Sequence, residues 1–311
     1  TLPYLVTDMK MADIDGDGQL DVVVTSPNSK TVRVLRQTLP GTFTDMGGFA
    51  SPTTDAGTSL AIGDCDEDGD PDLLVGTNVG GVAAFRNYQN TGGYTFTGSA
   101  QTIPGIGTIQ SMAMADVNGD GHLDLALVQA NDVPKVFSGN GDCTFSATPR
   151  WAGFAVSTSS PKLVFGDVRS DGSIELAVSD GSNGRLYYGF NPSSWNYPSY
   201  ANFPSLPAPS KYTGMPIADL PGNGLLDLFL GWNSISGSKS YTLVTGSLVQ
   251  QTSPGLPSID AMAICDFVAD GQNDVMAVDL GTNELVAYSA TTMIDSWSLP
   301  IGTSQALISC G

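Results

Sequence analysis

The sequence predicts an all-β fold, a propeller of six four-stranded blades with seven as the alternative, and three observations carry this prediction. A short acidic phrase occurs six times at intervals of roughly 50 residues, as expected for one supersecondary unit used repeatedly. Short apolar runs flank every copy, and turn residues separate further short runs. Four short strands in each period of about 50 residues are typical of a propeller blade. The six copies begin at Asp13, Asp64, Asp116, Asp167, Asp219 and Asp266.

The first two predicted strands of each unit flank the acidic phrase. The run before it is apolar, as in Ser59–Ile62, and so is the run after it, as in Leu73–Val75. Short runs that are rich in branched residues and bounded by turn signals favour buried strands over helices. In the fifth copy the same pattern predicts one first strand at Gly214–Ile217. A third strand follows a turn, as in Gly81–Phe85, and a fourth carries aromatic residues, as in Tyr94–Phe96.

Length and charge limit the classes of function. A ring of repeats closes as one domain, so a single domain is expected over residues 1–311. The net charge is −19, from 31 acidic and 12 basic residues, and no basic patch offsets repulsion by phosphate, which argues against nucleic-acid partners. No apolar run approaches the length of a membrane span, so membrane insertion is not expected. Most of the acid lies in the repeated phrase, which favours local cation sites.

The first three copies have oxygen-bearing side chains at positions 1, 3, 5 and 9. They are loop 1 (Asp13–Asp21), loop 2 (Asp64–Asp72) and loop 3 (Asp116–Asp124). Calcium takes about six to eight oxygen ligands, and the backbone carbonyl of position 7 can add one. Glycine at position 6 lets the backbone turn sharply. An EF-hand is excluded because it needs Glu at position 12, where these copies have Val24, Val75 and Leu127.

The phrase and its flanking strands resemble the FG-GAP or VCBS-type repeats of integrin α-subunit propellers and many secreted repeat proteins, over nearly the whole chain. The segment Asn140–Phe145 is similar to the N-G-D-G-T-F hairpin of VCBS repeats, with Cys143 in place of a glycine. The resemblance implies about three structural Ca²⁺ ions, held in calcium loops between the first two strands of blades 1–3. The implied metal ligands are Asp13, Asp15, Asp17, Gln19, Asp21, Asp64, Asp66, Asp68, Asp70, Asp72, Asp116, Asn118, Asp120, His122 and Asp124.

The last three copies depart from the ligand pattern at position 3. That position holds Arg169 in loop 4 (Asp167–Glu175), Pro221 in the fifth copy and Val268 in the sixth. We expect these copies to keep the turn without binding calcium. In loop 4 the positive charge of Arg169 is available to the remaining acids, which are Asp167, Asp171 and Glu175.

The four cysteines form no CxxC pair, which argues against a zinc site. Cys265 ends the first strand of the sixth unit, and Cys310 ends a further strand that repeats the first-strand pattern after the sixth period. We predict a disulfide between these two residues, which would lock the ring and favour the folded state. Cys65 and Cys143 are either free or paired with each other.

The sequence favours a non-catalytic function. His122 is the only histidine, and its side chain is expected to face solvent at position 7, so a Ser-His-Asp or Cys-His mechanism has little support. The leading hypothesis is a secreted or cell-surface, calcium-stabilised binding or adhesion module, with carbohydrate or an extracellular protein as its partner. Trp195 lies in a Pro- and Ser-rich stretch, Pro192–Ser210, and is a candidate for stacking on a sugar.

Two other functions remain open at this stage. One is a structural subunit of an extracellular fibre or surface layer, in which copies of the chain meet through the strand Ala306–Ile308 or the Pro-rich stretch. The other is a polysaccharide-active enzyme, because some secreted enzymes resemble this repeat architecture. Fold alone does not choose among the three.

Overall fold

The computed structural model describes residues 7–25, 31–39, 42–50, 55–90, 93–156, 160–181, 183–206, 211–219, 226–232, 238–244, 247–250, 259–265, 274–279, 284–289 and 292–298. These residues form strands joined by turns, with no helix among them, and so none of them forms a helix that could cross a membrane. The strands make antiparallel sheets in which neighbours follow the order of the chain. The chain divides into two compact units, Thr1–Pro161 and Lys162–Cys310.

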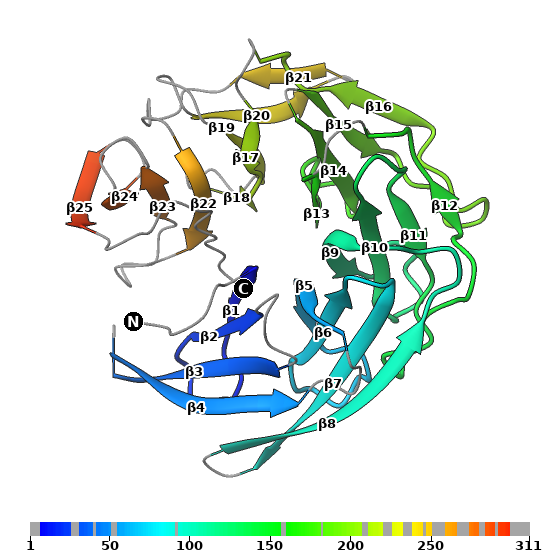
Figure 1. Cartoon of the computed structure of the whole chain (residues 1–311). Coiled ribbons are helices and arrows are strands. Elements are labelled where there is room, and N and C mark those ends of the chain that lie inside the picture. The colour runs from blue at the N-terminus through cyan, green and yellow to red at the C-terminus, as the bar shows by residue number, and fades with distance from the viewer. Residues whose placement is uncertain are drawn as a thin grey trace. The chain divides into compact units, whose positions relative to one another are not determined.

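The first unit contains three four-stranded sheets (Figure 1). The first sheet consists of β1 (Asp8–Ala12), β2 (Asp21–Thr25), β3 (Thr31–Leu39) and β4 (Thr42–Ala50). The second consists of β5 (Gly57–Gly63), β6 (Asp72–Thr77), β7 (Gly81–Asn90) and β8 (Gly93–Thr102). The third consists of β9 (Ile109–Ala115), β10 (Asp124–Gln129), β11 (Lys135–Phe137) and β12 (Trp151–Ala152).

The second unit also contains three sheets. One consists of β13 (Lys162–Gly166), β14 (Glu175–Asp180), β15 (Asn183–Tyr188) and β16 (Ser199–Asn202). The next consists of β17 (Tyr212–Gly214), β18 (Ile217–Ala218), β19 (Asp227–Trp232), β20 (Ser238–Val244) and β21 (Ser247–Gln250). The last consists of β22 (Ile259–Cys265), β23 (Asp274–Asp279), β24 (Glu284–Ser289) and β25 (Thr292–Ser298).

The predicted number of four-stranded blades is wrong. Within the described residues five sheets have four strands, and the sheet that contains β19 has five because its first strand is split into β17 and β18. Pro216 lies at the split, where it has no N–H to donate to the ladder. Its carbonyl still accepts a hydrogen bond from the N–H of Phe229 at 2.9 Å. The fold is therefore all-β with five four-stranded blades, and neither the predicted six nor the alternative seven.

The predicted strand positions in the first two sheets are confirmed, whereas the single strand predicted at Gly214–Ile217 is wrong because of the split at Pro216. β5 contains the expected Ser59–Ile62 and β6 contains Leu73–Val75. The second strand of a sheet is buried along its whole length in β2, β6, β10 and β19, and in β14 as far as Ser179. Burial on both faces explains why these strands read as continuous apolar runs and not as an alternating pattern.

The core of the first unit lies between successive sheets. Ile14 and Val23 of the first sheet pack with Leu60, Leu73 and Phe85 of the second, and all five are at most 1% exposed. Burial of each such side chain contributes roughly 1.5–3 kcal/mol. Ile14 belongs to the acidic loop and not to a strand, so the loop itself is anchored in the core.

The structure has acidic loops at the connections β1–β2, β5–β6 and β9–β10, where calcium loops were predicted. It does not show that they are calcium loops. The predicted position of the loops, between the first two strands of their sheets, is confirmed. The description of the fold does not include calcium, and calcium binding by the loops stays a prediction.

Candidate cation-binding loops

The first residue of each loop organises the turn around its carboxylate. In loop 1, Asp13 Oδ1 accepts the N–H of Asp17 at 3.0 Å and Asp13 Oδ2 accepts the N–H of Gly18 at 2.8 Å. The same two hydrogen bonds recur in loops 2, 3 and 4, at 2.9–3.2 Å. In each loop the backbone N–H groups of positions 5 and 6 donate to the carboxylate of position 1, which is Asp64, Asp116 or Asp167. Loop 4 winds in this way although it has Arg169 at position 3, so the turn does not depend on an acid at that position.

The fifth and sixth positions complete the turn. Asp17 Oδ1 accepts the N–H of Gln19 at 2.9 Å, and Asp68, Asp120 and Asp171 accept from their own position-7 residues in the same way. Position 6 needs glycine because its φ is positive, at +85° in Gly18 and +94° in Gly69. The sequence therefore encodes the loop by ordinary turn chemistry.

The carboxylate at position 9 braces the loop against its own sheet. Asp72 Oδ2 accepts the N–H of Cys65 at 2.9 Å, and Asp72 Oδ1 accepts the N–H of Asn87 on β7 at 2.8 Å. Asp21 and Asp124 make the corresponding pairs of bonds, and all three side chains are completely buried. Burial raises the pKa of Asp21, Asp72 and Asp124 to about 6 each, and that of Glu175 in loop 4 to about 7.

The oxygens of loops 1 and 2 fit a hard divalent cation. One carboxylate oxygen each from Asp13, Asp15 and Asp17 lies within 4.8 Å of the others, and the same holds for Asp64, Asp66 and Asp72. Asp15 Oδ2 and Asp66 Oδ1 are buried and make no hydrogen bond within the described residues. A set of carboxylate oxygens gathered in this way is what Ca²⁺ prefers.

Loop 3 is arranged differently at position 3. Asn118 Nδ2 donates to Asp120 Oδ2 at 2.9 Å, and the N–H of Asp120 donates to Asn118 Oδ1 at 2.8 Å. Among the position-7 residues, Gln19 Nε2 lies 3.4 Å from Asp17 Oδ2, and the ring of His122 contacts Glu67. The side chains of Gln19 and His122 are thus engaged with other residues, so their backbone carbonyls are the groups that could ligate a metal. In loop 2 the position-7 residue is Asp70, whose backbone N–H donates to Asp68 Oδ1.

Arginine side chains contact acids in loops 1, 2 and 4. Of these arginines, the sequence predicted only Arg169 of loop 4. Arg169 Nη1 lies 3.1 Å from Asp171 Oδ2, as expected in kind, and its guanidinium stands 5.6 Å from the centroid of the Tyr188 ring. Arg36 contacts Asp15 and lies 3.2 Å from Asp17, while Arg86 Nε lies 3.7 Å from Asp66 Oδ2.

A sequence signal for Arg36 and Arg86 exists. Both lie on the third strand of their sheet, directly after its apolar run, and precede an amide residue, Gln37 or Asn87. The register places them at matching points, since Leu35 pairs with Val22 and Phe85 pairs with Leu73.

A disulfide joins loop 2 to the third sheet. Cys65 and Cys143 are bonded, with their Cα atoms 4.8 Å apart, which settles the alternatives of free or mutually paired thiols. The N–H of Cys143 also donates to the carbonyl of Cys65 at 2.9 Å. Cys143 has φ +58° at the place where the repeat motif has glycine. Cys310, the predicted disulfide partner of Cys265, lies outside the described residues, and so do most of the fifth and sixth acidic copies.

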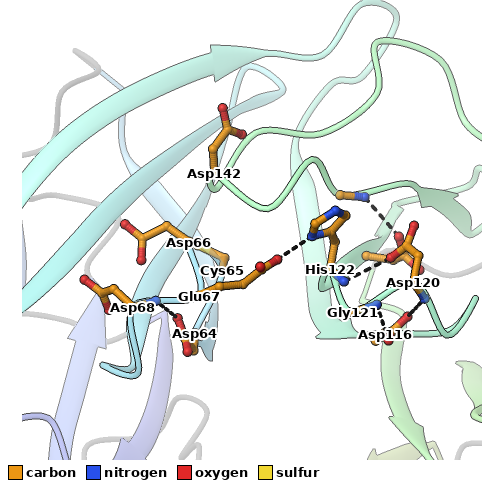
Figure 2. Close-up of polar contacts among 12 residues, drawn as sticks. Asp64, Cys65, Asp66, Glu67, Asp68, Asp116, Asp120, Gly121, His122 and Asp142 are labelled. Atoms are coloured by element: carbon orange, nitrogen blue, oxygen red, sulfur yellow. Dashed lines mark hydrogen bonds and ion pairs between the residues drawn. The ribbon is translucent and has the colours of Figure 1, made fainter.

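Glu67 of loop 2 and His122 of loop 3 meet between neighbouring sheets. Figure 2 shows the carboxylate of Glu67 directed at Nδ1 of His122, with Asp142 of the third sheet above loop 2. Glu67 has φ +64° at position 4, where loops 1 and 3 have Gly16 and Gly119. A non-glycine residue is uncommon in this left-handed conformation, and the side chain of Glu67 contacts His122 of the neighbouring loop.

Comparison with known families identifies the repeat. The model of the FG-GAP-like repeat matches residues 13–75, 66–127 and 116–178, which together span more than half of the chain. The chain belongs to the FG-GAP-like repeat family. Each match begins at or just after the start of an acidic loop and ends in or just after the second strand of the following sheet, so the family motif contains the loops described above.

Solved structures show the same fold at low identity. The N-terminal region of BBS1 in complex with ARL6, from mercury-soaked crystals, has a TM-score of 0.60 at 13% identity, covering 96% of this chain and 83% of that one. A lectin from Agrocybe aegerita that recognises non-reducing terminal N-acetylglucosamine has a TM-score of 0.57 at 20% identity, covering 94% and 80%. The Dos1 propeller has a TM-score of 0.55 at 12% identity, covering 96% and 71%. The fold of this FG-GAP chain is thus a β-propeller. No curated protein sequence matches the chain.

Proposed function

We propose that this FG-GAP propeller is a secreted or cell-surface binding module without catalytic activity, stabilised by calcium. The observation that carries the proposal is the gathering of carboxylate oxygens in loops 1 and 2, including a buried oxygen of Asp15 and one of Asp66 that make no hydrogen bond within the described residues. Each loop gathers three acids beside a single arginine, Arg36 or Arg86, and this excess of negative charge favours a bound cation.

Calcium would be held by the side chains at positions 1, 3, 5 and 9 and by the carbonyl of position 7. When bound, it supplies positive charge that compensates the clustered carboxylates. Loop 3 offers Asn118 in place of one acid, so its donor set carries one negative charge less. Because each loop is anchored in the core through its second residue, an ion bound there would stabilise the folded blade and not a free surface turn.

The disulfide supports placement outside the reducing cytosol. Disulfides such as Cys65–Cys143 form and persist mainly in oxidising compartments.

The proposed partner is a carbohydrate or an extracellular protein. Support comes from the two similar propellers, of which one recognises a terminal sugar and the other is complexed with a protein. The candidate contact for a sugar is Trp195, which has φ +49° and packs edge-on against Phe190, with ring centroids 5.8 Å apart. Its turn is held by Asn191, which accepts the N–H of Ser193 at 3.0 Å.

Calcium dependence is tested by thermal melting of the full chain in calcium and in EGTA. Free calcium at about 100 times the dissociation constant would stabilise the fold by roughly 2.7 kcal/mol per site. The melting temperature should therefore rise by several degrees in calcium. Asp68→Asn in loop 2 should reduce this rise, whereas Asp171→Asn in loop 4, the matched control, should leave it unchanged. Equal melting temperatures in calcium and EGTA would reject the calcium part of the proposal.

The ligand is tested on a glycan array with calcium present. Retention of wild type and loss of retention in Trp195→Asn would support sugar recognition at this turn; asparagine tolerates the left-handed backbone of Trp195. Tyr88→Ala, which changes an exposed aromatic residue on β7, is the control that should still bind. Equal retention of both variants would place sugar binding elsewhere, and absence of any retained glycan would leave the protein partner as the proposal.

The two other hypotheses have their own assays. The fibre subunit was predicted from Ala306–Ile308, which lie outside the described residues. Concentration-dependent filaments in negative-stain images would favour it. Release of reducing ends from a polysaccharide panel would favour an enzyme.

A further inference from the structure

Arg36 reaches into loop 1 from the neighbouring strand of its own sheet. It lies on β3, directly after Leu35, and its Nε contacts Asp15 Oδ2 while Nη2 donates to Asp17 Oδ2 at 3.2 Å. The side chain of Asp15 is completely buried, and that of Arg36 is about a quarter exposed. A guanidinium thus rests on two of the three carboxylates that gather in this loop.

The contact balances charge without satisfying the hydrogen-bonding groups. Asp15 Oδ2 and Arg36 Nε are both buried, and neither makes a well-aligned hydrogen bond within the described residues despite their proximity. Asp15 Oδ2 is therefore paired in charge with Arg36 but retains its capacity to accept a hydrogen bond or to ligate a cation. This unsatisfied buried oxygen is independent of the turn geometry of the loop.

The distance between an arginine and the position-3 acid differs among the first three loops. At the matching position of the second sheet, Arg86 Nε lies 3.7 Å from Asp66 Oδ2, and its Nη2 donates to the carbonyl of Asp142 on the third sheet. At the matching position of the third sheet stands Ser138, which follows Phe137, the partner of Leu125. The contact between the arginine and the position-3 acid is thus closest in loop 1 and longer in loop 2. In the third sheet a serine stands in place of the arginine.

We propose that Arg36 is a resident cation of loop 1, which neutralises Asp15 and Asp17 in the absence of metal and must move aside when a divalent cation binds. The inference rests on the calcium binding proposed above and adds the residue that sets the affinity of one loop. A guanidinium and Ca²⁺ compete for the same oxygens, because both are positive and a Ca²⁺–oxygen contact of about 2.3–2.6 Å leaves no room for an N–H donor. Loop 1 is consequently weaker in calcium binding than its carboxylates alone would make it.

The test is isothermal titration calorimetry of the full chain with Ca²⁺, comparing wild type with Arg36→Gln. Removing the competing charge should lower the dissociation constant of one site by about tenfold or more. Arg33→Gln is the matched control, because Arg33 lies on the same strand and pairs with Asp45 at 2.6 Å, outside the acidic loop. The double variant Arg36→Gln/Asp15→Asn should lose the gain, which assigns it to loop 1.

A second measurement guards against misfolding of the variant. In EGTA, Arg36→Gln should melt at a lower temperature than Arg33→Gln. In calcium, the two variants should melt at the same temperature. If Arg36→Gln does not fold, Arg36→Lys retains the charge on a side chain without the planar fork, and its dissociation constant should lie between those of wild type and the expected glutamine variant.

The outcomes separate the two proposals. Calcium binding with equal affinities in Arg36→Gln and Arg33→Gln would overturn the resident-cation role alone. A gain that persists in the double variant would overturn it as well, because the tightened site would not be loop 1. No calcium binding by any variant would overturn both this inference and the proposed calcium stabilisation.

Discussion

Asn87 donates its side-chain amide to the carbonyl of Ile14 at 2.8 Å, across 73 positions of sequence. Asn87 lies on β7 of the second sheet, and Ile14 is the second residue of loop 1 in the first sheet. The second residue of loop 2, Cys65, accepts an equivalent bond from Cys143 of the third sheet. The second residues of loops 1 and 2 are therefore each held by a residue of the next repeat along the chain.

Asn87→Ala should destabilise the chain by roughly 1–3 kcal/mol, because it leaves the carbonyl of Ile14 buried without its partner. The backbone bond from Asn87 to Asp72 would remain. Urea denaturation measures the change. Asn78→Ala, at an exposed turn position, is the control and should shift the midpoint little. Equal shifts in the two variants would mean that the amide of Asn87 does not hold the sheets together.

Cys65→Ala/Cys143→Ala should lower the stability by roughly 2–4 kcal/mol, since the bond closes a loop of 78 positions in the unfolded chain. The measurement is the melting temperature with and without a dithiol reductant. Wild type should lose stability when reduced, and reduced wild type should approach the double variant. Any change that the reductant causes in the melting temperature of the double variant would come from the other two cysteines, Cys265 and Cys310. A double variant as stable as oxidised wild type would contradict the prediction.

Stability in EGTA should depend on pH through the carboxylates at position 9. Burial raises the pKa of Asp124 to about 6, so between its unfolded value near 3.8 and about 6 the folded state binds more protons than the unfolded state. Its contribution to stability is complete below pH 3.8 and is lost as the pH rises through 6. Asp124→Asn should therefore lose less stability than wild type between pH 4 and pH 7 in urea denaturation.

Asp142→Asn is the control of opposite sign for this pH series. A hydrogen bond from Thr144 lowers the pKa of Asp142, so this group adds stability as the pH rises. This contribution is complete above the unfolded value near 3.8, so Asp142→Asn should leave the decline between pH 4 and pH 7 nearly unchanged. A wild-type profile that Asp124→Asn does not flatten would contradict the assignment to position 9.

The Glu67–His122 contact should couple loops 2 and 3 in a manner that depends on pH. The hydrogen bond to Glu67 raises the pKa of His122 above 6.5, so the coupling is present in full below pH 6.5 and is lost as the pH rises through the raised value. A double-mutant cycle of Glu67→Gln and His122→Gln, measured at pH 6 and at pH 9, should give a larger coupling at pH 6. Equal coupling at both values would show that the contact does not involve a charged imidazole.

Local features of the repeat were accessible from sequence, whereas contacts between repeats were not. The apolar runs beside Asp64 and Asp72 predicted β5 and β6, because short branched runs and turn residues report local backbone preferences. The split at Pro216 could have been expected, since proline interrupts a ladder, but the repeated pattern outweighed that signal.

The surroundings of the acids required three-dimensional register. Arg36 reaches Asp15 only because Leu35 pairs with Val22, a relation that the linear sequence does not state. The pairing of Cys65 with Cys143 likewise joins two different repeats and remained one of two alternatives. Position 9 was predicted as a ligand, and its role as a buried brace that accepts backbone N–H groups was missed.

The disulfide between loop 2 and the third sheet determines where the chain can be divided. A fragment that ends after Thr102 would retain every strand of the first two sheets. It would nevertheless present Cys65 as an unpaired thiol and remove the backbone donor of Cys143 that the carbonyl of Cys65 uses. The smallest piece that contains the first two sheets with their bonds intact therefore ends beyond β8, after Cys143 in the connection between β11 and β12.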